Sequence, residues 1–274
     1  MTNASQRLYR RFLAEVTDAN LSDAPATDSI VTEAHLAHLP RCVQRYFHFM
    51  KVVGQPRVWS FRAQFVGRFR LRRGLGWMPA EAWQYNTGVE VARIFVMRLR
   101  FAGVVPMIGR DTYRNGHGRM IGKVLDRFTV ADGQGEEFDI GELTTYLNDA
   151  LLLAPSMLLG SSTTWTGIDD HTFDVALNDA GRTVTGRVFL DDDGAPVDFS
   201  TTDRFADLPD GLVQAEWRTP IQRWELVDGR PFPGPSGAVW HLPDGPLPYI
   251  EGRFVPNTVA YNIAPTGLAE DLIS

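Results

Sequence analysis

The sequence contains one cysteine and no long apolar run, and both absences limit what the chain can be. Cys42 is the only cysteine among 274 residues, so an intramolecular disulfide is excluded. We expect it to pack in an amphipathic helical segment. No segment approaches the roughly 20 consecutive apolar residues that a membrane-spanning helix needs, and no cationic, apolar leader opens the chain. We therefore expect no membrane span and a cytoplasmic location.

The sequence also lacks the motifs that usually mark cofactor-dependent and metal-dependent enzymes. It has no G-x-G-x-x-G or Walker A loop, no G-x-S-x-G nucleophile elbow, and no H-E-x-x-H or paired C-x-x-C motif. His35 and His38 share one helical turn, and residues 191–194 resemble the start of a calcium loop without its downstream glutamate. A surface pair and a hairpin turn explain these two features better. We therefore expect neither a cofactor nor a metal.

Charges of one sign are missing from two long stretches of the chain. The net charge of −6 argues against a nucleic-acid partner for the protein as a whole. Residues 39–80 hold no Asp or Glu but nine Lys and Arg, and residues 128–181 hold no Lys or Arg but ten acids. The two stretches could form neighbouring surfaces that pair, or the basic one could bind an acidic ligand, partner or headgroup. The sequence leaves both open.

One helix is predicted in the middle of a chain that otherwise reads as strands, at residues 139–153. Asp139 is placed to cap it, and Glu142 follows three residues later, as in a capping box. Pro155 ends the helix. An apolar face follows from helical spacing, and it comprises Leu143, Tyr146, Leu147, Ala150 and Leu151.

Strands are predicted on both sides of this helix. Residues 91–101 alternate with a period of two, which places Arg93, Phe95 and Met97 on one face. Asn115 and Gly116 indicate a tight hairpin. The expected fold is mainly β, of the α+β class: a single curved antiparallel sheet or half-barrel wrapped around the central helix. Residues 1–56 form N-terminal helices packed on this sheet, and residues 57–265 form the half-barrel, in one domain overall.

Seven tryptophans, mostly on predicted strands, indicate an interior that is either filled with aromatic rings or lined by them around an apolar cavity. For a wide or half-open barrel we expect the cavity. In strand 213–226, Trp217 and Arg218 are adjacent, so only one of them can point inward. The residues that we expect to bind a substrate are Trp77, Trp83, Gln84, Arg98, Trp165, Trp217 and Trp240.

Glu142 and Tyr146 are the candidate catalytic residues. They lie one helical turn apart, so both can point from the central helix toward the cavity. A glutamate buried there without a basic neighbour would have a raised pKa and could donate a proton near neutral pH. The hydroxyl of Tyr146 would then hold an oxygen of the substrate. Helix capping by Glu142 and core packing by Tyr146 are the alternative roles.

Several short motifs together resemble a bacterial family of unknown function, DUF6544, over residues 39 to 255. They are Leu39, Pro40 and Val43 to Tyr46; Trp77 to Pro79 with Gln84; Asp111 to Tyr113 with Gly116 to Met120; Asp139, Glu142, Leu143, Tyr146 and Leu147; Trp165 with Ile168 to Asp170; and Trp240 to Pro243 with Tyr249. Ala80 and Asn148 depart from the pattern, which has Phe and an acid there. The resemblance implies a curved antiparallel half-barrel similar to lipoprotein-carrier folds, which hold apolar ligands.

Two functions fit such a cavity. The first is a cofactor-independent cyclase or isomerase that folds a polyene-like or polyketide-like substrate, as in bacterial secondary metabolism. Such chemistry depends on shape and excluded water more than on a nucleophile. The second is a non-catalytic binding or carrier protein for lipid-like ligands. The expected partner in both is a hydrophobic small molecule, and the sequence does not define the oligomeric state.

Overall fold

A computed structural model describes residues 2–25, 29–101 and 103–268, and one large antiparallel sheet dominates it. Its strands follow the order β6-β5-β4-β3-β2-β1-β17-β16-β13-β10-β9-β8-β7. The first half comprises β1 (Ser60–Phe69), β2 (Met78–Thr87), β3 (Ala92–Phe101), β4 (Val105–Arg114), β5 (His117–Val124) and β6 (Phe128–Gln134). The second comprises β7 (Thr163–Gly167), β8 (Thr172–Asp179), β9 (Arg182–Leu190), β10 (Pro196–Thr201), β13 (Glu216–Arg218), β16 (Ser236–Leu242) and β17 (Gly245–Phe254).

Smaller elements accompany this sheet. Two separate hairpins are β11 (Phe205–Leu208) with β12 (Gly211–Gln214), and β14 (Trp224–Val227) with β15 (Arg230–Pro233). Strand β18 (Ala260–Tyr261) pairs with β1, and short 3-10 helices lie at Pro155–Leu158 and Pro256–Thr258. The edge strands β6 and β7 do not pair with each other in the described residues, so the sheet is a half-barrel. The predicted fold class is confirmed.

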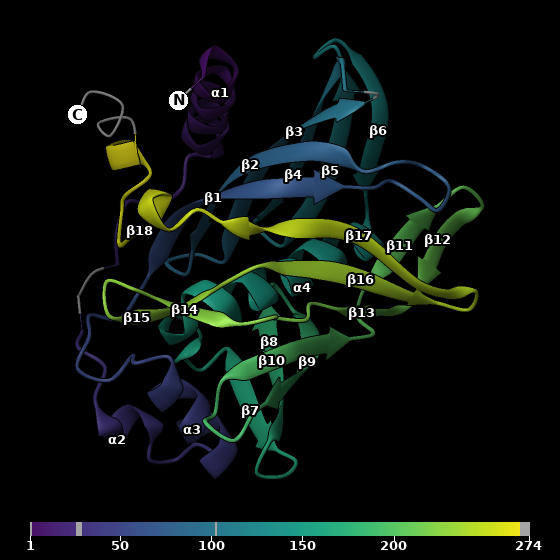
Figure 1. The fold of residues 1–274 in the computed structure, drawn as a ribbon. Helices are drawn as coiled ribbons and strands as arrows, with labels where there is room; N and C mark the ends of the chain where they lie inside the picture. Colours follow the sequence, from purple (N-terminus) through teal and green to yellow (C-terminus); the bar gives the residue numbers. More distant parts are fainter. Residues whose placement is uncertain (1, 26–28, 102, 269–274) are drawn as a thin grey trace.

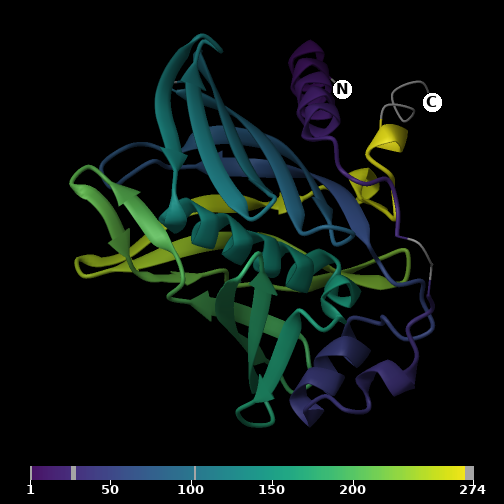
Figure 2. The same ribbon diagram turned by 180° about the vertical axis from the view of Figure 1, so that it is seen from behind.

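The two halves of the sheet are joined by the pairing of β1 with β17, which brings Phe65 opposite Phe254. The strong twist of such a sheet curls it around the helix α4 (Glu136–Leu153), which lies on its concave side between the two halves (Figures 1 and 2). Thirteen residues of this helix are buried, on all sides rather than on one stripe. A helix surrounded in this way is typical of a molecular interior.

The start of α4 corrects the predicted cap. The helix begins at Glu136, three residues earlier than expected, and Gly135 precedes it with φ of 111°. Asp139 therefore lies inside the first turn. Its carboxylate accepts a hydrogen bond from the Gly118 N–H at 2.7 Å and pairs with Arg182 at 2.6 Å. Asp139 thus fixes the helix to β5 and β9 instead of capping it.

Gly118 has no side chain, and this allows α4 to approach β5 closely. A Cβ atom at Gly118 would lie 2.1 Å from the carbonyl oxygen of Phe138. No other residue type fits at that distance without a shift of the backbone.

The other helices pack on both faces of the sheet. α1 (Asn3–Ala19) covers the convex face of β2 and β3. α3 (Arg41–Phe49) packs on β7 and β8 in the same core as α4, and α2 (Glu33–Leu36) lies next to α3 (Figure 1). The Tyr46 hydroxyl of α3 donates to the carbonyl of Leu151 at 2.7 Å, which ties α3 to the end of α4. No helix in the described residues is long and apolar enough to cross a membrane.

The basic stretch 39–80 pairs only in part with the acidic stretch 128–181. Arg45 donates to the main-chain carbonyl of Asp170 at 2.5 Å. Arg68 and Arg73 instead pair with carboxylates of the C-terminal half, at Glu251 and Asp244, over 2.5 and 2.9 Å. Of the two alternatives left open by the sequence, pairing between the two stretches is therefore not the main arrangement.

Candidate functional site

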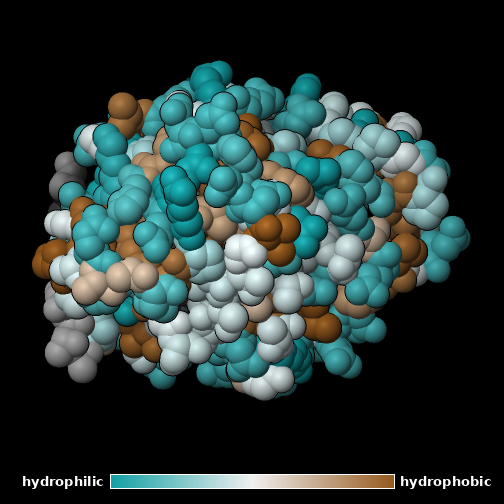
Figure 3. Space-filling view, turned by 90° about the horizontal axis from the view of Figure 1, so that it is seen from below, coloured by the Kyte–Doolittle hydropathy of each residue, from teal (hydrophilic) through white to brown (hydrophobic). Residues whose placement is uncertain are grey.

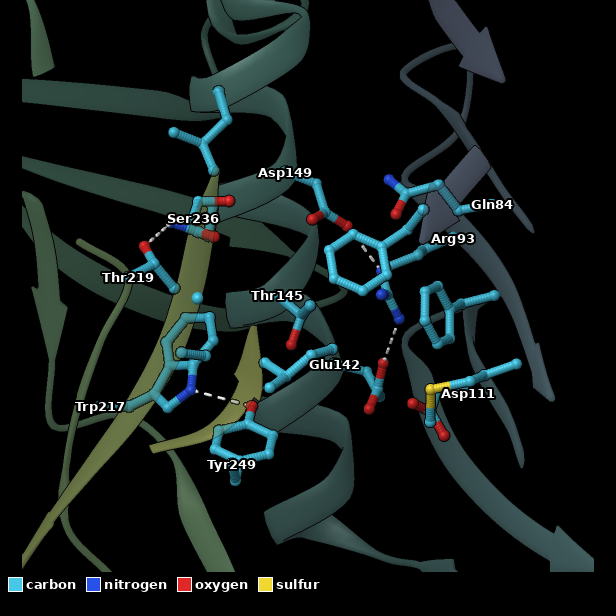
Figure 4. A pocket seen from close by; sticks show the side chains of 18 of the residues that line it. Gln84, Arg93, Asp111, Glu142, Thr145, Asp149, Trp217, Thr219, Ser236 and Tyr249 are labelled. Atoms are coloured by element: carbon cyan, nitrogen blue, oxygen red, sulfur yellow. Dashed lines mark hydrogen bonds and ion pairs between the residues drawn. The ribbon is translucent and has the colours of Figure 1, made fainter. Parts of the chain in front are cut away.

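A cavity of about 150 Å³ lies between α4 and the concave face of the sheet. Strands β1 to β4 form one wall, α4 crosses the middle, and β13, β16 and β17 form the opposite wall (Figure 4). Most of the lining is apolar: Phe65, Phe69, Phe95, Met97, Leu152, Trp217, Ala238, Ile250 and Phe254.

Aromatic pairs across β1 and β17 build the apolar wall. The rings of Phe65 and Phe254 meet edge to face at 5.7 Å, and those of Phe69 and Tyr249 do so at the same centroid distance. Such edge contacts stabilise a pair of rings beyond the area that it buries. The wall that faces the cavity is therefore made of fixed side chains.

A buried ion-pair network forms the polar side of the cavity. The Arg93 guanidinium donates from Nε to Asp149 at 2.7 Å and from Nη1 to Glu142 at 3.0 Å (Figure 4). All three side chains are at most one tenth exposed. The guanidinium carbon also lies 4.7 Å from the ring centroid of Phe95. The network joins β3 to α4 and places charge at the edge of an apolar wall.

Burial changes the protonation of the carboxyl groups in this network. Desolvation, reinforced by the nearby carboxyl of Asp111, raises the pKa of Glu142 to about 7, although Arg93 acts in the opposite direction. Desolvation also raises the pKa of Asp111, against the lowering effect of Arg93 and Arg204. Near neutral pH, Glu142 can therefore hold or release a proton.

Arg204 is a second cation that lines the cavity. Its guanidinium carbon lies 4.2 Å from the ring centroid of Trp217 and 5.5 Å from that of Trp240. Its Nε is buried and has no hydrogen-bond partner among the described residues. An unsatisfied donor of this kind costs free energy, and a ligand or a water molecule can offset that cost.

Two further pairs of polar groups in the wall satisfy one another. Asn148 donates to the hydroxyl of Thr219 at 2.8 Å, and the Trp217 indole donates to the hydroxyl of Tyr249 at 3.0 Å (Figure 4). These bonds fix the orientation of Trp217. Asn148, where the family pattern has an acid, is therefore a cavity residue with a defined partner.

The cavity is suited to holding an apolar group next to a titratable polar cluster. Most of its surface is apolar, and Arg93, Glu142 and Asp149 stand together at one side (Figure 4). The described residues contain no group of three or more His, Cys, Asp or Glu side chains placed to hold a metal ion.

Three of the residues predicted from the sequence line this cavity. Glu142 does so from α4, Gln84 from β2 and Trp217 from β13. Trp217 points inward, and the adjacent Arg218 pairs with Asp198 at 2.6 Å. The structure thus gives Glu142 a basic neighbour, Arg93, that the sequence prediction did not include.

Two predicted tryptophans pack against the helices α1 and α3 and do not line the cavity. Trp83 lies 4.5 Å from the ring of Tyr9 in α1, between centroids, and Trp165 lies 5.3 Å from that of Phe47 in α3. Trp83 alternates with the inward-facing Gln84, which places the tryptophan on the convex face. The prediction that these two rings line the cavity is wrong.

Three further predicted residues also lie outside the cavity lining. Arg98 pairs with Glu81 at 2.5 Å, and Trp77 lies over the guanidinium groups of Arg68 and Arg70, both at 4.7 Å. Trp240 stacks on Tyr249, with ring centroids 6.1 Å apart, and lies beside Trp217 without lining the cavity itself. A tryptophan-lined cavity is therefore corrected to a phenylalanine-rich one with a single tryptophan.

Tyr146 does not serve the cavity either. Its hydroxyl donates to the carbonyl of Thr87 at 3.1 Å, and the side chain is buried in the core. Burial raises the pKa of this phenol well above its usual value. Tyr146 holds α4 to the end of β2 and does not line the cavity, so the structure places its hydroxyl away from the site where the contact was expected.

Sequence reasoning missed Arg93, Asp111, Asp149 and Arg204. A signal was present for Arg93, because it is the one charged residue on the apolar face of the alternating segment 91–101. Asp149 stands two helical turns after Glu142, which also places it on the same side of α4. For Asp111 and Arg204 the sequence offers no comparable signal.

The fold and the cavity together define a half-barrel protein with a small apolar site beside a buried charged cluster. Residues 29–252 match the sequence family DUF6544, described as a family of unknown function. Because the match covers most of the chain, the protein belongs to this family. No curated protein matches the sequence significantly.

Two solved structures show a weak overall likeness. A LolA superfamily protein from Nitrosomonas europaea is 9% identical, with a TM-score of 0.41 over 83% of this chain and 92% of that one. A DUF1329 family protein from Desulfovibrio piger is 12% identical, with a TM-score of 0.41 over 86% and 94% of the two chains. At these values the likeness says nothing about ligand or activity.

Proposed function

We propose that this protein binds a hydrophobic, lipid-like small molecule, with an apolar end of the ligand inserted between α4 and the concave face of the sheet. The observation that carries the proposal is the phenylalanine-rich wall of the cavity, next to the buried network of Arg93, Glu142 and Asp149. Sites for small molecules are usually of this kind, mostly apolar with a few polar groups that fix orientation.

The size of the cavity limits what can enter it. A volume of about 150 Å³ is comparable to that of an engineered cavity that admits benzene. A slender acyl or prenyl end fits into this space, whereas a folded polyene or polyketide would require α4 or the wall to move. Binding therefore ranks above cyclisation, which needs the whole reacting part of the substrate enclosed.

The test is titration with a dansyl-labelled fatty acid, followed by fluorescence. Ala238→Phe places a ring in the cavity and should weaken binding by about tenfold or more. Ala206→Phe is the matched control, because Ala206 is equally buried but lies in β11, outside the cavity. Melting temperatures of both variants show whether each is folded. If Ala238→Phe does not fold, Thr145→Phe serves as a second variant that fills the cavity. Equal affinity in the filled and control variants would contradict the proposal.

A second candidate is proton-transfer catalysis, as in isomerisation or cyclisation of a bound alkene. The observation that favours it is the Glu142 carboxyl, which faces the cavity with a pKa of about 7. With Tyr146 turned away, the cationic hydrogen-bond donors that line the cavity are those of Arg93 and Arg204. Incubation with a polyunsaturated fatty acid and chromatography of the extract separate the two candidates. An isomer that forms with the wild type but not with Glu142→Gln would favour catalysis, and unchanged ligand would favour binding alone.

A further inference from the structure

Large apolar side chains are exposed mainly at three hairpin turns along one border of the sheet. Of the eleven large hydrophobic residues that are exposed in the described part of the chain, six lie there, and we call this set the apolar rim. Val104 is 78% exposed, and Phe128 and Val130 are each 58% exposed. The apolar rim consists of Leu71, Phe101, Val104, Leu125, Phe128 and Val130.

The three turns are neighbours in space. β1–β2, β3–β4 and β5–β6 are consecutive antiparallel hairpins, so their turns emerge at the same end of the strands. The Leu125 N–H donates to the carbonyl of Pro106 at 2.9 Å, which joins the second turn to the third. In Figure 1 they follow the upper right border of the sheet. Exposed apolar residues in such a row form a surface rather than isolated contacts.

The same border is basic in a protein whose net charge is −6. Arg72, Arg100 and Arg127 are exposed and Lys123 is half-buried, and none of the four forms an ion pair with a carboxylate in the described part of the chain. The acidic side chain closest in sequence, Asp126, is already paired with Arg11. Of these four cations, Arg72 belongs to the basic stretch 39–80 recognised in the sequence.

We propose that the apolar rim docks on the surface of an anionic phospholipid bilayer. Exposed apolar side chains flanked by unpaired cations fit such a surface, because the rings enter the interface while the cations meet the phosphates. The face seen from below in Figure 3 is mainly hydrophilic, with apolar residues in small separate patches. At the apolar rim, by contrast, exposed apolar residues lie next to cations, whose charge is complementary to anionic lipid headgroups.

The rim is also connected to the cavity. Phe95, Met97, Leu99 and Phe101 alternate along β3 and share one face. The first two line the cavity, Leu99 is buried, and Phe101 is exposed at the border. An apolar side of β3 thus runs from the bilayer contact to the cavity. The docking itself stands independently of the proposed ligand.

Flotation with lipid vesicles tests this surface on the full chain. The wild type should float with vesicles of phosphatidylcholine and phosphatidylglycerol, stay behind with phosphatidylcholine alone, and detach in high salt. Phe101→Ser with Phe128→Ser should lower the bound fraction on the order of tenfold. Arg100→Gln with Arg127→Gln should have a similar effect, because each cation near an anionic surface contributes about fivefold in affinity.

Two controls replace comparable side chains elsewhere. Leu226→Ser removes an apolar residue that is 69% exposed on β14, and Arg253→Gln removes an exposed cation on β17. Both should float like the wild type. The cavity-filling variant Ala238→Phe should also float, which separates a failure of docking from a failure of ligand binding. No flotation of the wild type, equal binding to neutral vesicles, or an equal loss in the controls would overturn the proposal.

Discussion

Arg93 is the residue on which the polar side of the cavity depends. It is the only cation within ion-pair distance of both Glu142 and Asp149 among the described residues. Charged side chains that are buried as deeply as these three are tolerated only while they are paired. Arg93 therefore carries more of the stability than a surface arginine does.

Replacing Arg93 by leucine should lower the free energy of unfolding by about 3–5 kcal/mol at neutral pH, because two buried carboxylates lose their partner. Urea denaturation measures this. Arg98→Leu is the comparison on the outer face of the same strand, where a single pair with Glu81 is partly exposed. Its loss should be about 1 kcal/mol or less. Similar losses in the two variants would mean that the Arg93 network does not stabilise the fold.

Glu142 makes stability depend on pH in a predictable direction. Its pKa is about 7 in the folded protein and about 4.3 in an unfolded chain, so the folded state binds the extra proton between these values. The stability that this group contributes is complete below about pH 4.3 and is lost as the pH rises through about 7. Glu142→Gln should remove this fall, which is a few kcal/mol at most. Denaturation curves at several pH values would show it. A difference between variant and wild type that stays constant from pH 4 to 8 would contradict the assignment.

At the scale of elements, α4 shows what sequence patterns can and cannot predict. Helical spacing predicted the buried residues Leu143, Leu147 and Ala150, and all three are in the core. The cap was wrong because Asp139 forms long-range bonds with Gly118 and Arg182, which local rules do not contain. The burial of Glu142 was predicted, but that of Asp149 was not, since charged side chains on a helix normally indicate its solvent face.

Gly118→Ala should destabilise the contact of α4 with β5. The added methyl group would lie within 2.1 Å of the Phe138 carbonyl oxygen, and overpacking of this kind typically costs about 1–3 kcal/mol. Gly76→Ala is the control, because nothing lies within 4 Å of its added Cβ. Thermal unfolding of both variants measures the effect. Equal melting temperatures would show that α4 can shift away from the sheet without cost.

At the scale of the whole molecule, the strands were predictable and their closure was not. Alternation along residues 91–101 and the Asn115-Gly116 turn depend on neighbouring residues, so the sequence contains them directly. The pairing of Phe65 with Phe254 joins residues far apart in the chain. Without knowledge of this pairing, the inner and outer faces of β2 and β3 could not be distinguished. That is why Trp83 and Arg98 were placed in the cavity and Arg93 was not.

The central claim is that the ligand occupies the space between α4 and the β1–β17 wall. Photolabelling with a diazirine-bearing fatty acid, followed by peptide mass spectrometry, tests this most directly. The predicted labels fall on residues that line the cavity, such as Leu152 in α4 and Ile250 in β17, and they disappear in Ala238→Phe. Labels confined to the aromatic clusters around Trp83 or Trp165, or an unchanged yield in Ala238→Phe, would contradict it.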